Sequence, residues 1–270
     1  MSFRGGLIAV ARQDRTPLLP SLMLFRTLPP IKLRRFLAGA MAVLFSAGPA
    51  RAQYADDLTA SIGVASDERC QGLSWSDGDP VVRGRLSVPV YEGLSLDGAA
   101  VALWGSDRHA GAAAVVDVGP SYVRQIGAWR LTADARYHLF VGASGQGYGE
   151  IGAGAGFLMG PISVDLMGSY APRQTSIGGD NLHLSASAFV GVPGTPLTMS
   201  AWVGRSSGDV RNPAKAARLR PDGTYWDHGV GVDYLKGCWS AGLRYVNSSI
   251  DGPSRRDAGA SMVGRVGLSL

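Results

Sequence analysis

The feature that most constrains the fold is a repeated two-residue alternation of apolar and polar side chains between residues 81 and 270. The clearest stretch is 129–139. One face there carries Trp129, Leu131, Ala133, Ala135, Tyr137 and Leu139, and the other carries Arg130, Thr132, Asp134, Arg136 and His138. Successive side chains of a strand point to opposite faces, so the pattern predicts strands with one apolar and one polar face.

Repetition of this pattern predicts a closed, antiparallel, up-and-down transmembrane β-barrel. The twelve expected strands are 57–67, 81–90, 94–105, 113–126, 129–140, 148–158, 162–171, 181–190, 197–205, 225–234, 238–247 and 259–270. An even strand number is typical of single-chain bacterial barrels. Connectors after even-numbered strands are short and mostly contain Gly, as hairpin turns require, whereas those after odd-numbered strands are long. The long connectors, including 68–80, are expected outside the cell and both termini in the periplasm.

Aromatic residues near the strand ends add independent support for a membrane barrel. Two aromatic girdles are typical of a barrel in a bilayer. An unpaired N–H or C=O in hydrocarbon costs several kcal/mol, so a sheet there must close on itself. A soluble sandwich or lipocalin-like barrel remains the alternative, because alternation alone allows it. The expected girdle residues are Trp129, Phe157, Tyr234 and Trp239 at one rim, and Trp104, Tyr137, Tyr170, Trp226 and Tyr245 at the other.

The N-terminal region has the features of a secretory signal peptide. Lys32, Arg34 and Arg35 precede the apolar run 36–47, and the small-x-small pattern that signal peptidase cleaves ends at Ala52. The expected domains are therefore 1–52, an extension with a signal peptide that starts at Met1 or Met23, and 53–270, the barrel. The first 52 residues carry eight of the 26 Lys and Arg and one of the 21 acids, so the remainder has a net charge near −2. This balance argues against nucleic acid as a partner.

The polar faces of the strands supply the candidate pore-lining residues. Arg83, Arg85, Arg244 and Arg265 are expected to form a basic wall, because closure of the last strand on the first makes them neighbours. The opposite wall is expected to be acidic, with two arginines interspersed. We expect small polar or zwitterionic solutes to pass with a modest ion preference. In the alternative, the charges pair and fill a narrow interior. The opposite wall comprises Asp117, Arg130, Asp134, Arg136, Glu150 and Asp165.

Two other functional classes stay open. An outer-membrane hydrolase would need a nucleophile, a base and an orienting acid within hydrogen-bond reach. His183, Ser185 and Asp180 are near one another in sequence, but the parity of their strand turns the first two toward the lumen. We therefore expect no catalytic residue, metal site or cofactor. A structural or adhesive barrel would use the basic connector 206–224 and its flank, with Arg205, Arg211, Lys215, Arg218 and Arg220.

Cysteines and glycines have structural interpretations. Cys70 and Cys238 are the only cysteines, and the predicted topology places them at opposite ends of the barrel, too far apart for a disulfide, so two free thiols are expected. Gly152, Gly154 and Gly156 alternate with apolar residues inside one strand, so they are expected to make room in the lumen rather than bind phosphate.

Several short motifs resemble the TorF-type family of proteobacterial porin-like outer-membrane proteins. The family shows an aromatic-Arg-Gly-Ile/Val-Ser run that leads to Ser/Thr-Asp-Gly-x-Pro-x-Val-Gln-Gly, and the stretch 71–84 here is similar to it. Gln71 and the run 83–85 depart from the family, which usually has Arg and Gln-Gly-Gly there. The resemblance implies an outer-membrane pore without catalytic residues. Further matching stretches are 101–106, 148–151 and 225–231.

The last strand, 262–270, resembles the C-terminal strand that the outer-membrane insertion machinery recognises, although its final residue is Leu rather than an aromatic. Outer-membrane lipid and this machinery are therefore the expected partners.

Overall fold

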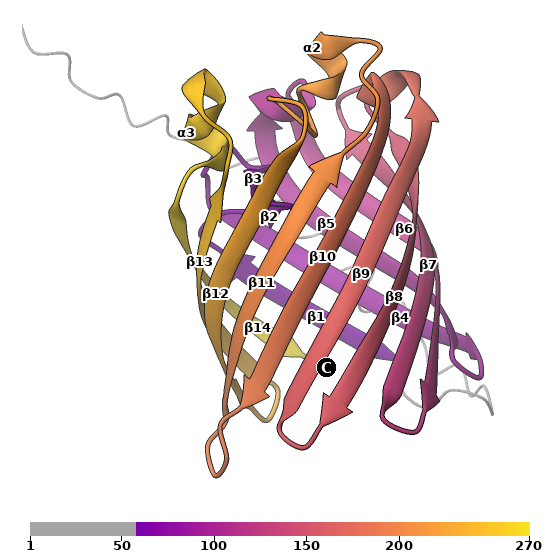
Figure 1. Ribbon diagram of the computed structural model, residues 1–270, viewed down its shortest axis with the longest axis vertical. Coiled ribbons are helices and arrows are strands. Elements are labelled where there is room, and N and C mark those ends of the chain that lie inside the picture. The colour runs from indigo at the N-terminus through magenta and orange to yellow at the C-terminus, as the bar shows by residue number, and fades with distance from the viewer. Residues whose placement is uncertain (1–57) are drawn as a thin grey trace, which may run out of the picture. The chain divides into compact units, whose positions relative to one another are not determined.

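The computed structural model describes residues 58–270; the expected signal peptide and its cleavage after Ala52 lie outside the described residues. Twelve antiparallel strands form a closed barrel, which confirms the predicted fold and strand number (Figure 1). Each expected strand overlaps an observed one. The barrel strands are β1 (Thr59–Ala65), β4 (Val81–Tyr91), β5 (Leu94–Ser106), β6 (Ala112–Ile126), β7 (Trp129–Val141), β8 (Tyr148–Met159), β9 (Ile162–Gln174), β10 (Gly179–Gly191), β11 (Leu197–Ser207), β12 (Tyr225–Lys236), β13 (Trp239–Ser248) and β14 (Ser261–Ser269).

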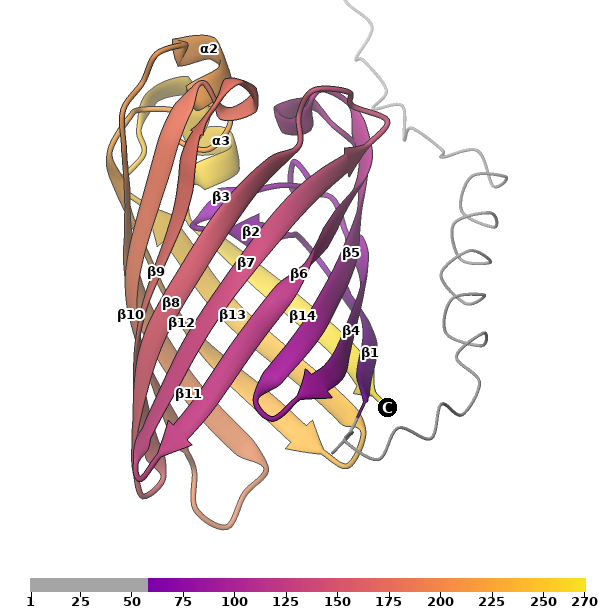
Figure 2. The ribbon, with the colours of Figure 1, turned by 90° about the vertical axis from the view of Figure 1, so that its right-hand side faces the viewer.

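Closure joins the first strand to the last. β1 pairs with β14 from Ser61↔Ser269 to Ala65↔Arg265, and β1 pairs with β4 on its other edge (Figure 2). The backbone N–H of Leu270 donates to the carbonyl of Ala60 at 2.8 Å. No sheet edge is left open in the barrel, which is the condition for a sheet in hydrocarbon.

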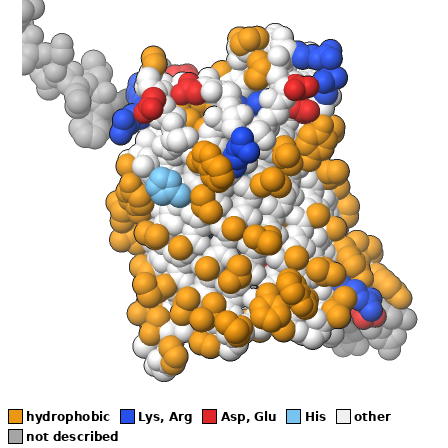
Figure 3. Space-filling view, in the orientation of Figure 1, with side chains coloured by type: hydrophobic (Ala, Val, Ile, Leu, Met, Phe, Trp, Pro, Cys, Tyr) orange, Lys and Arg blue, Asp and Glu red, His pale blue; other side chains and the backbone are white. Residues whose placement is uncertain are grey.

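Many large apolar side chains are exposed on the outer wall, and on the face that Figure 3 shows they are spread over most of its height, in orange. In β7 the outward side chains of Trp129, Leu131, Tyr137 and Leu139 are exposed, whereas the inward His138 is buried. An exposed apolar surface of this extent marks contact with a membrane or a partner rather than with water. Seven of the nine expected girdle residues are exposed, and Trp104 and Tyr245 are half-buried.

The two ends of the barrel differ in their connectors. At the turn end, short turns join β4 to β5, β6 to β7, β8 to β9, β10 to β11 and β12 to β13, and the C-terminus lies there. At the loop end the longer connectors carry the helical turns found within residues 58–270. These turns are η1 (Asp107–His109), η2 (Thr175–Ile177), α2 (Pro213–Ala216), η3 (Gly252–Ser254) and α3 (Arg255–Ala258). No helix within residues 58–270 is long and apolar enough to cross a membrane.

One connector departs from the predicted arrangement. The sequence predicts that the connector 68–80 is an external loop. Instead, the segment 66–80 turns into the barrel and forms a short hairpin of β2 (Arg69–Cys70) and β3 (Leu73–Ser74) (Figure 2). Gln71 and Gly72 form its two-residue turn with φ of 52° and 79°. Two positive φ values are the signature of a type I′ hairpin turn, and Gly adopts them without strain. We call 66–80 the inner hairpin.

Apolar side chains explain why the inner hairpin folds inward. Leu73 and Trp75 are only 1% and 5% exposed. The Trp75 ring lies edge-on to His109, with centroids 4.7 Å apart, and 5.8 Å from Phe140. An external loop would leave these side chains in water, whereas burial stabilises each by about 1.5–3 kcal/mol. The apolar core therefore surrounds the inner hairpin at the loop end.

Candidate functional site

The barrel interior contains two adjoining cavities. The one beneath the inner hairpin has a volume of about 480 Å³. The other, toward the turn end, has a volume of about 570 Å³. Arg85, Asp117 and Arg136 line both cavities and therefore mark their junction. These volumes suit small molecules.

The structure brings most of the predicted pore-lining residues to these cavities. Asp134 lines the cavity at the turn end, whereas Arg130 and Asp165 line neither and face each other across Gly156. The residues that line the cavity beneath the inner hairpin are Arg83, Arg85, Asp117, Arg136, Glu150, Arg244 and Arg265.

Nine of the ten predicted residues take part in ion pairs, as the alternative interpretation expected. Arg85 is the exception among the described residues. The pairs are Arg83–Glu68 at 3.5 Å, Arg130–Asp165 at 2.9 Å, Arg136–Asp134 at 3.3 Å, Arg136–Glu150 at 3.7 Å, His138–Asp117 at 2.7 Å, Arg244–Asp233 at 3.5 Å and Arg265–Asp233 at 2.7 Å. The interior is thus a set of local pairs rather than two walls of opposite sign.

Asp233 on β12 is the residue that sequence reasoning missed in the basic wall. Its carboxylate binds both Arg244 and Arg265. Gly242 pairs with Asp233 on one side and Arg265 on the other, and a Cβ there would collide with both side chains. The sequence contained a signal for this residue, because Asp233 alternates with Val232 and Tyr234 and therefore belongs to the polar, inward face of its strand.

On the opposite wall, glycines likewise leave room for charged side chains of the neighbouring strands. A Cβ at Gly152 would collide with the Asp134 carboxylate, and one at Gly156 would collide with the Asp165 carboxylate. The glycines in β8 therefore accommodate side chains of the neighbouring strands, as the sequence predicted.

His138 links two carboxylates beneath the inner hairpin. Its Nδ1 lies 2.7 Å from Asp117 Oδ1, and its Nε2 lies 3.4 Å from Glu150 Oε1. The Tyr148 ring stacks on the imidazole at 4.4 Å between centroids. Nδ1 makes the hydrogen bond to Asp117, whereas Nε2 has no hydrogen-bond partner and only approaches Glu150.

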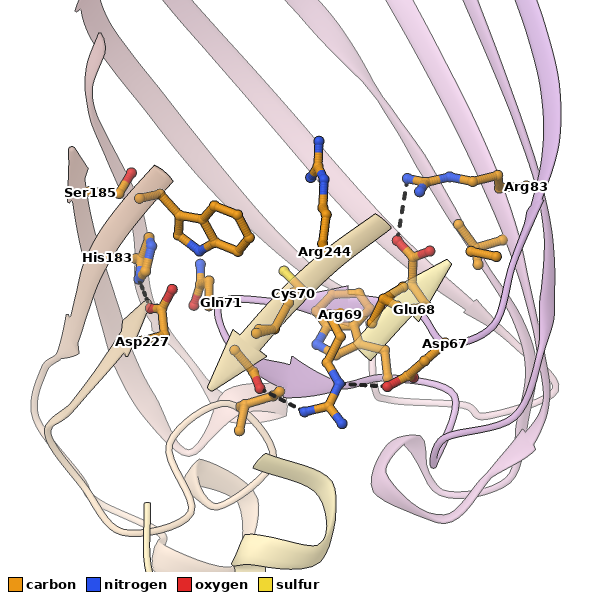
Figure 4. Close-up of a pocket in the computed structure, with 18 of the residues that line it drawn as sticks. Asp67, Glu68, Arg69, Cys70, Gln71, Arg83, His183, Ser185, Asp227 and Arg244 are labelled. Atoms are coloured by element: carbon orange, nitrogen blue, oxygen red, sulfur yellow. Dashed lines mark hydrogen bonds and ion pairs between the residues drawn. The ribbon is translucent and has the colours of Figure 1, made fainter. Parts of the chain in front are cut away.

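The inner hairpin is attached to the wall and to the loops by polar contacts (Figure 4). Arg69 Nε lies 2.5 Å from Asp67 Oδ2, and its Nη1 donates to the carbonyls of Asp257 at 3.1 Å and Gly259 at 3.4 Å. The Tyr225 hydroxyl donates to the carbonyl of Gln71 at 2.9 Å. These contacts connect the inner hairpin to β12 and to the connector between β13 and β14.

Buried groups of the loop end are held in defined charge states. His109 is 0% exposed and neither ring nitrogen has a hydrogen-bond partner. Burial, assisted by Arg218 and Arg108, lowers the pKa of His109 to about 2, so the ring is neutral at physiological pH. Burial also lowers the pKa of Arg218, whose guanidinium lies over the Phe140 ring at 4.8 Å.

The basic connector differs from its expected exposed form. Arg218 and Arg220 are only 6% and 3% exposed. Arg218 donates to the carbonyl of Gln146 at 2.8 Å, and Arg220 donates to that of Gly208 at 2.7 Å. These two arginines fix the connector to its neighbours, which removes them from any adhesive surface.

No hydrolytic arrangement is present among the described residues. Ser206 Oγ lies 3.0 Å from His183 Nδ1, but Asp227 Oδ1 approaches the same nitrogen at 3.8 Å. A catalytic triad places nucleophile and acid on opposite ring nitrogens. Ser206 is 0% exposed, and the predicted Asp180 accepts from Tyr170 instead.

Within residues 58–270, the structure supports neither a disulfide nor a metal site. Cys70 and Cys238 are both free thiols, as predicted. No group of three or more His, Cys, Asp or Glu in this part of the chain could hold a metal ion.

Comparison with known proteins identifies a family and a fold. The sequence model of a family described as "Bacterial protein of unknown function (Gcw_chp)" matches residues 49–263. No curated protein matches the chain. The NanC porin structure in its rhombohedral crystal form superposes with a TM-score of 0.53 at 11% identity, covering 79% of this chain and 99% of that one.

Two further solved structures have lower TM-scores. The KdgM porin has a TM-score of 0.49 at 14% identity, covering 78% of this chain and 97% of that one. The COG4313 outer membrane channel from Pseudomonas putida F1 has a TM-score of 0.49 at 12% identity, covering 83% and 99%. At these identities, the likeness to the NanC porin shows the fold alone.

Proposed function

The chain belongs to the Gcw_chp family of bacterial proteins, and because that family is described as of unknown function, we propose a function from the barrel itself. The protein is a porin-like channel of the outer membrane for passive diffusion of small polar or charged solutes. The observation that carries the proposal is a charged interior inside an apolar wall. The two cavities share Arg85, Asp117 and Arg136, so polar space continues from the turn end to the inner hairpin.

The orientation follows from general barrel architecture. Short turns face the periplasm and long loops the outside in outer-membrane barrels, which puts the C-terminus in the periplasm. The signal peptide within residues 1–52 then directs export and is cleaved after Ala52, and the last strand engages the insertion machinery. The assignment to the TorF-type family stays a prediction from the sequence motifs.

The inner hairpin favours a second candidate, a non-conducting structural barrel. It crosses the interior at the loop end, and Trp75, His109 and Phe140 pack together there. In the channel proposal, the inner hairpin narrows the path without closing it. The burial of Arg218 and Arg220 counts against an adhesive role of the basic connector.

Single-channel recording in a planar bilayer with a salt gradient tests both candidates. Discrete conductance steps are expected from the purified protein. Arg83→Glu with Arg85→Glu is expected to shift the reversal potential toward cations, because the new carboxylates attract cations into the lumen.

The control is Arg205→Glu, which makes one such arginine-to-glutamate change on the exposed outer face of β11. It is expected to leave the reversal potential unchanged. Absence of conductance in protein shown to be folded would refute the channel and favour the structural barrel. Conductance with unchanged selectivity in the double variant would refute the role of the two arginines.

A further inference from the structure

We propose that Arg83 and Arg85 on β4 form a binding position for the carboxylate of a small monoanionic solute, and that Glu68 of the inner hairpin already occupies its Arg83 half. The proposal names a solute class for the proposed channel, and it rests on the channel function only for the claim that the bound anion passes through the barrel. Glu68 is then a tethered competitor that weakens anion binding.

Within residues 58–270, Arg85 is the lumen arginine that has no ion-pair partner. Its side chain is exposed into the lumen, and it lines both cavities. Every other predicted lining residue has an ion-pair partner within 4.0 Å, whereas Arg85 has none among the described residues. A guanidinium that is open to a cavity and has no partner is free to bind an anion from solution.

Arg83 lies beside Arg85 and is already engaged. The two residues share one face of β4, about 6.6 Å apart along the strand. Arg83 Nη2 lies 3.5 Å from Glu68 Oε1, longer than the roughly 2.7–2.9 Å of a strong charge-assisted hydrogen bond. Glu68 Oε2 is buried and has no hydrogen-bond partner. The carboxylate is therefore placed against the basic pair without being well bound.

The position of Glu68 in the chain makes it an occupant rather than part of the wall. Glu68 belongs to the inner hairpin, next to Arg69, whose guanidinium is fixed to Asp67 and the loop-end carbonyls. Figure 4 shows Glu68 directed toward Arg83 and away from these contacts. The inner hairpin thus supplies a negative charge to a basic patch that belongs to the barrel.

Charge balance and shape select the ligand class. With Glu68 ionised against Arg83, the three side chains carry one net positive charge, located at Arg85. Asp117 and Arg136 line the same junction, but each already has an ion-pair partner on the barrel wall, so they leave the single charge of Arg85 as the one to be balanced among the described residues. The planar guanidinium fork matches a planar carboxylate. A small monocarboxylate fits these conditions better than a doubly charged phosphate.

Residue-resolved arginine modification tests the proposal without requiring conductance. The folded protein in detergent is treated with p-hydroxyphenylglyoxal, and modified arginines are identified by peptide mass mapping. Arg85 is expected to react faster than Arg83, Arg244 and Arg265. Lactate at constant ionic strength is expected to protect Arg85, whereas propane-1,2-diol, which has the same carbon skeleton without a carboxylate, is expected to give no protection.

The variant Glu68→Gln tests the role of the inner hairpin. It removes the charge but keeps the shape of the side chain. We expect faster modification of Arg83 and an approximately tenfold lower lactate concentration for half-protection of Arg85, the effect of about 1.4 kcal/mol. Arg130→Gln, a lumen arginine that lines neither cavity, is the control and is expected to leave protection unchanged.

Three outcomes would overturn the proposal: an unreactive Arg85, equal protection by the neutral diol, or unchanged lactate protection in Glu68→Gln. Inorganic phosphate that protects at lower concentration than lactate would overturn the carboxylate assignment. A protein that shows lactate protection but no bilayer conductance would refute the channel while leaving the anion position intact.

Discussion

Replacing Arg69 by Met should release the inner hairpin. Met is unbranched and apolar, so it keeps much of the packing but removes every hydrogen bond of the guanidinium. Two of these bonds, to the carbonyls of Asp257 and Gly259, connect the inner hairpin to the loop after β13. Asp67 keeps the hydroxyls of Ser74 and Ser76 on its Oδ1, at 2.6 and 2.9 Å, but its Oδ2 loses the contact with Arg69. That contact lies within the inner hairpin, so its loss removes no connection to the rest of the barrel.

The size of the effect follows from these two connections. A hydrogen bond from a charged donor contributes about 1.5–3 kcal/mol. One of the two is long at 3.4 Å, so we take about 3 kcal/mol for both together. At 1.4 kcal/mol per factor of ten, the population of the displaced hairpin should rise about 100-fold.

Cys70 reports this displacement, because it lies on β2 with only partial exposure. Burial also raises the pKa of its thiol, which suppresses the reactive thiolate. A polyethylene-glycol maleimide too large to enter the barrel should therefore modify Cys70 only when the inner hairpin is displaced. If displacement is fast and reversible, the modification rate follows the displaced population.

Two controls are present in the chain. Cys238 is exposed and should react at the same rate in every variant. Arg256→Met makes the same change in α3 at an exposed arginine and should leave the Cys70 rate at the wild-type value. Equal Cys70 rates in Arg69→Met and Arg256→Met would refute the view that Arg69 fixes the inner hairpin.

Two further predictions concern stability. His109 has a pKa of about 2 in the folded barrel and 6.5 as its ordinary value, so between these limits only the unfolded chain binds the proton. The contribution of the neutral His109 to the free energy of unfolding is therefore present above pH 6.5 and is lost as the pH falls. The urea midpoint of the wild-type protein should decrease between about pH 7 and pH 4, and His109→Leu should make that decrease smaller. An equal decrease in the variant would contradict the role of His109. A Cβ at Gly119 would collide with the backbone carbonyl of Ala135, whereas one at Gly264 would meet no atom within 4 Å. Gly119→Ala should lower the free energy of unfolding in urea by about 1–3 kcal/mol, and Gly264→Ala should lower it much less. Equal urea midpoints of the two variants would show that β6 and β7 move apart at Gly119 without cost.

For the charged residues of the lumen, the sequence predicts which face of a strand they lie on but not which residues they pair with. Parity alone places Arg83, Arg85, Asp117 and Glu150 inside, because a strand's side chains alternate strictly. Their partners depend on which residues lie at the same height on neighbouring strands, and that depends on the register. Asp233 neutralises two arginines of the expected basic wall for this reason.

By itself, the sequence determined the closed barrel, its strand number, its two unlike ends and the faces of its strands, because these follow from local alternation and from the need to pair every backbone group. Only the tertiary structure decided that the segment 66–80 folds inward, because its contacts to Tyr225 and Gly259 join residues distant in sequence. It also left Arg85 without an ion-pair partner in the described part of the chain, since a charge is free or neutralised only through neighbours that folding brings to it.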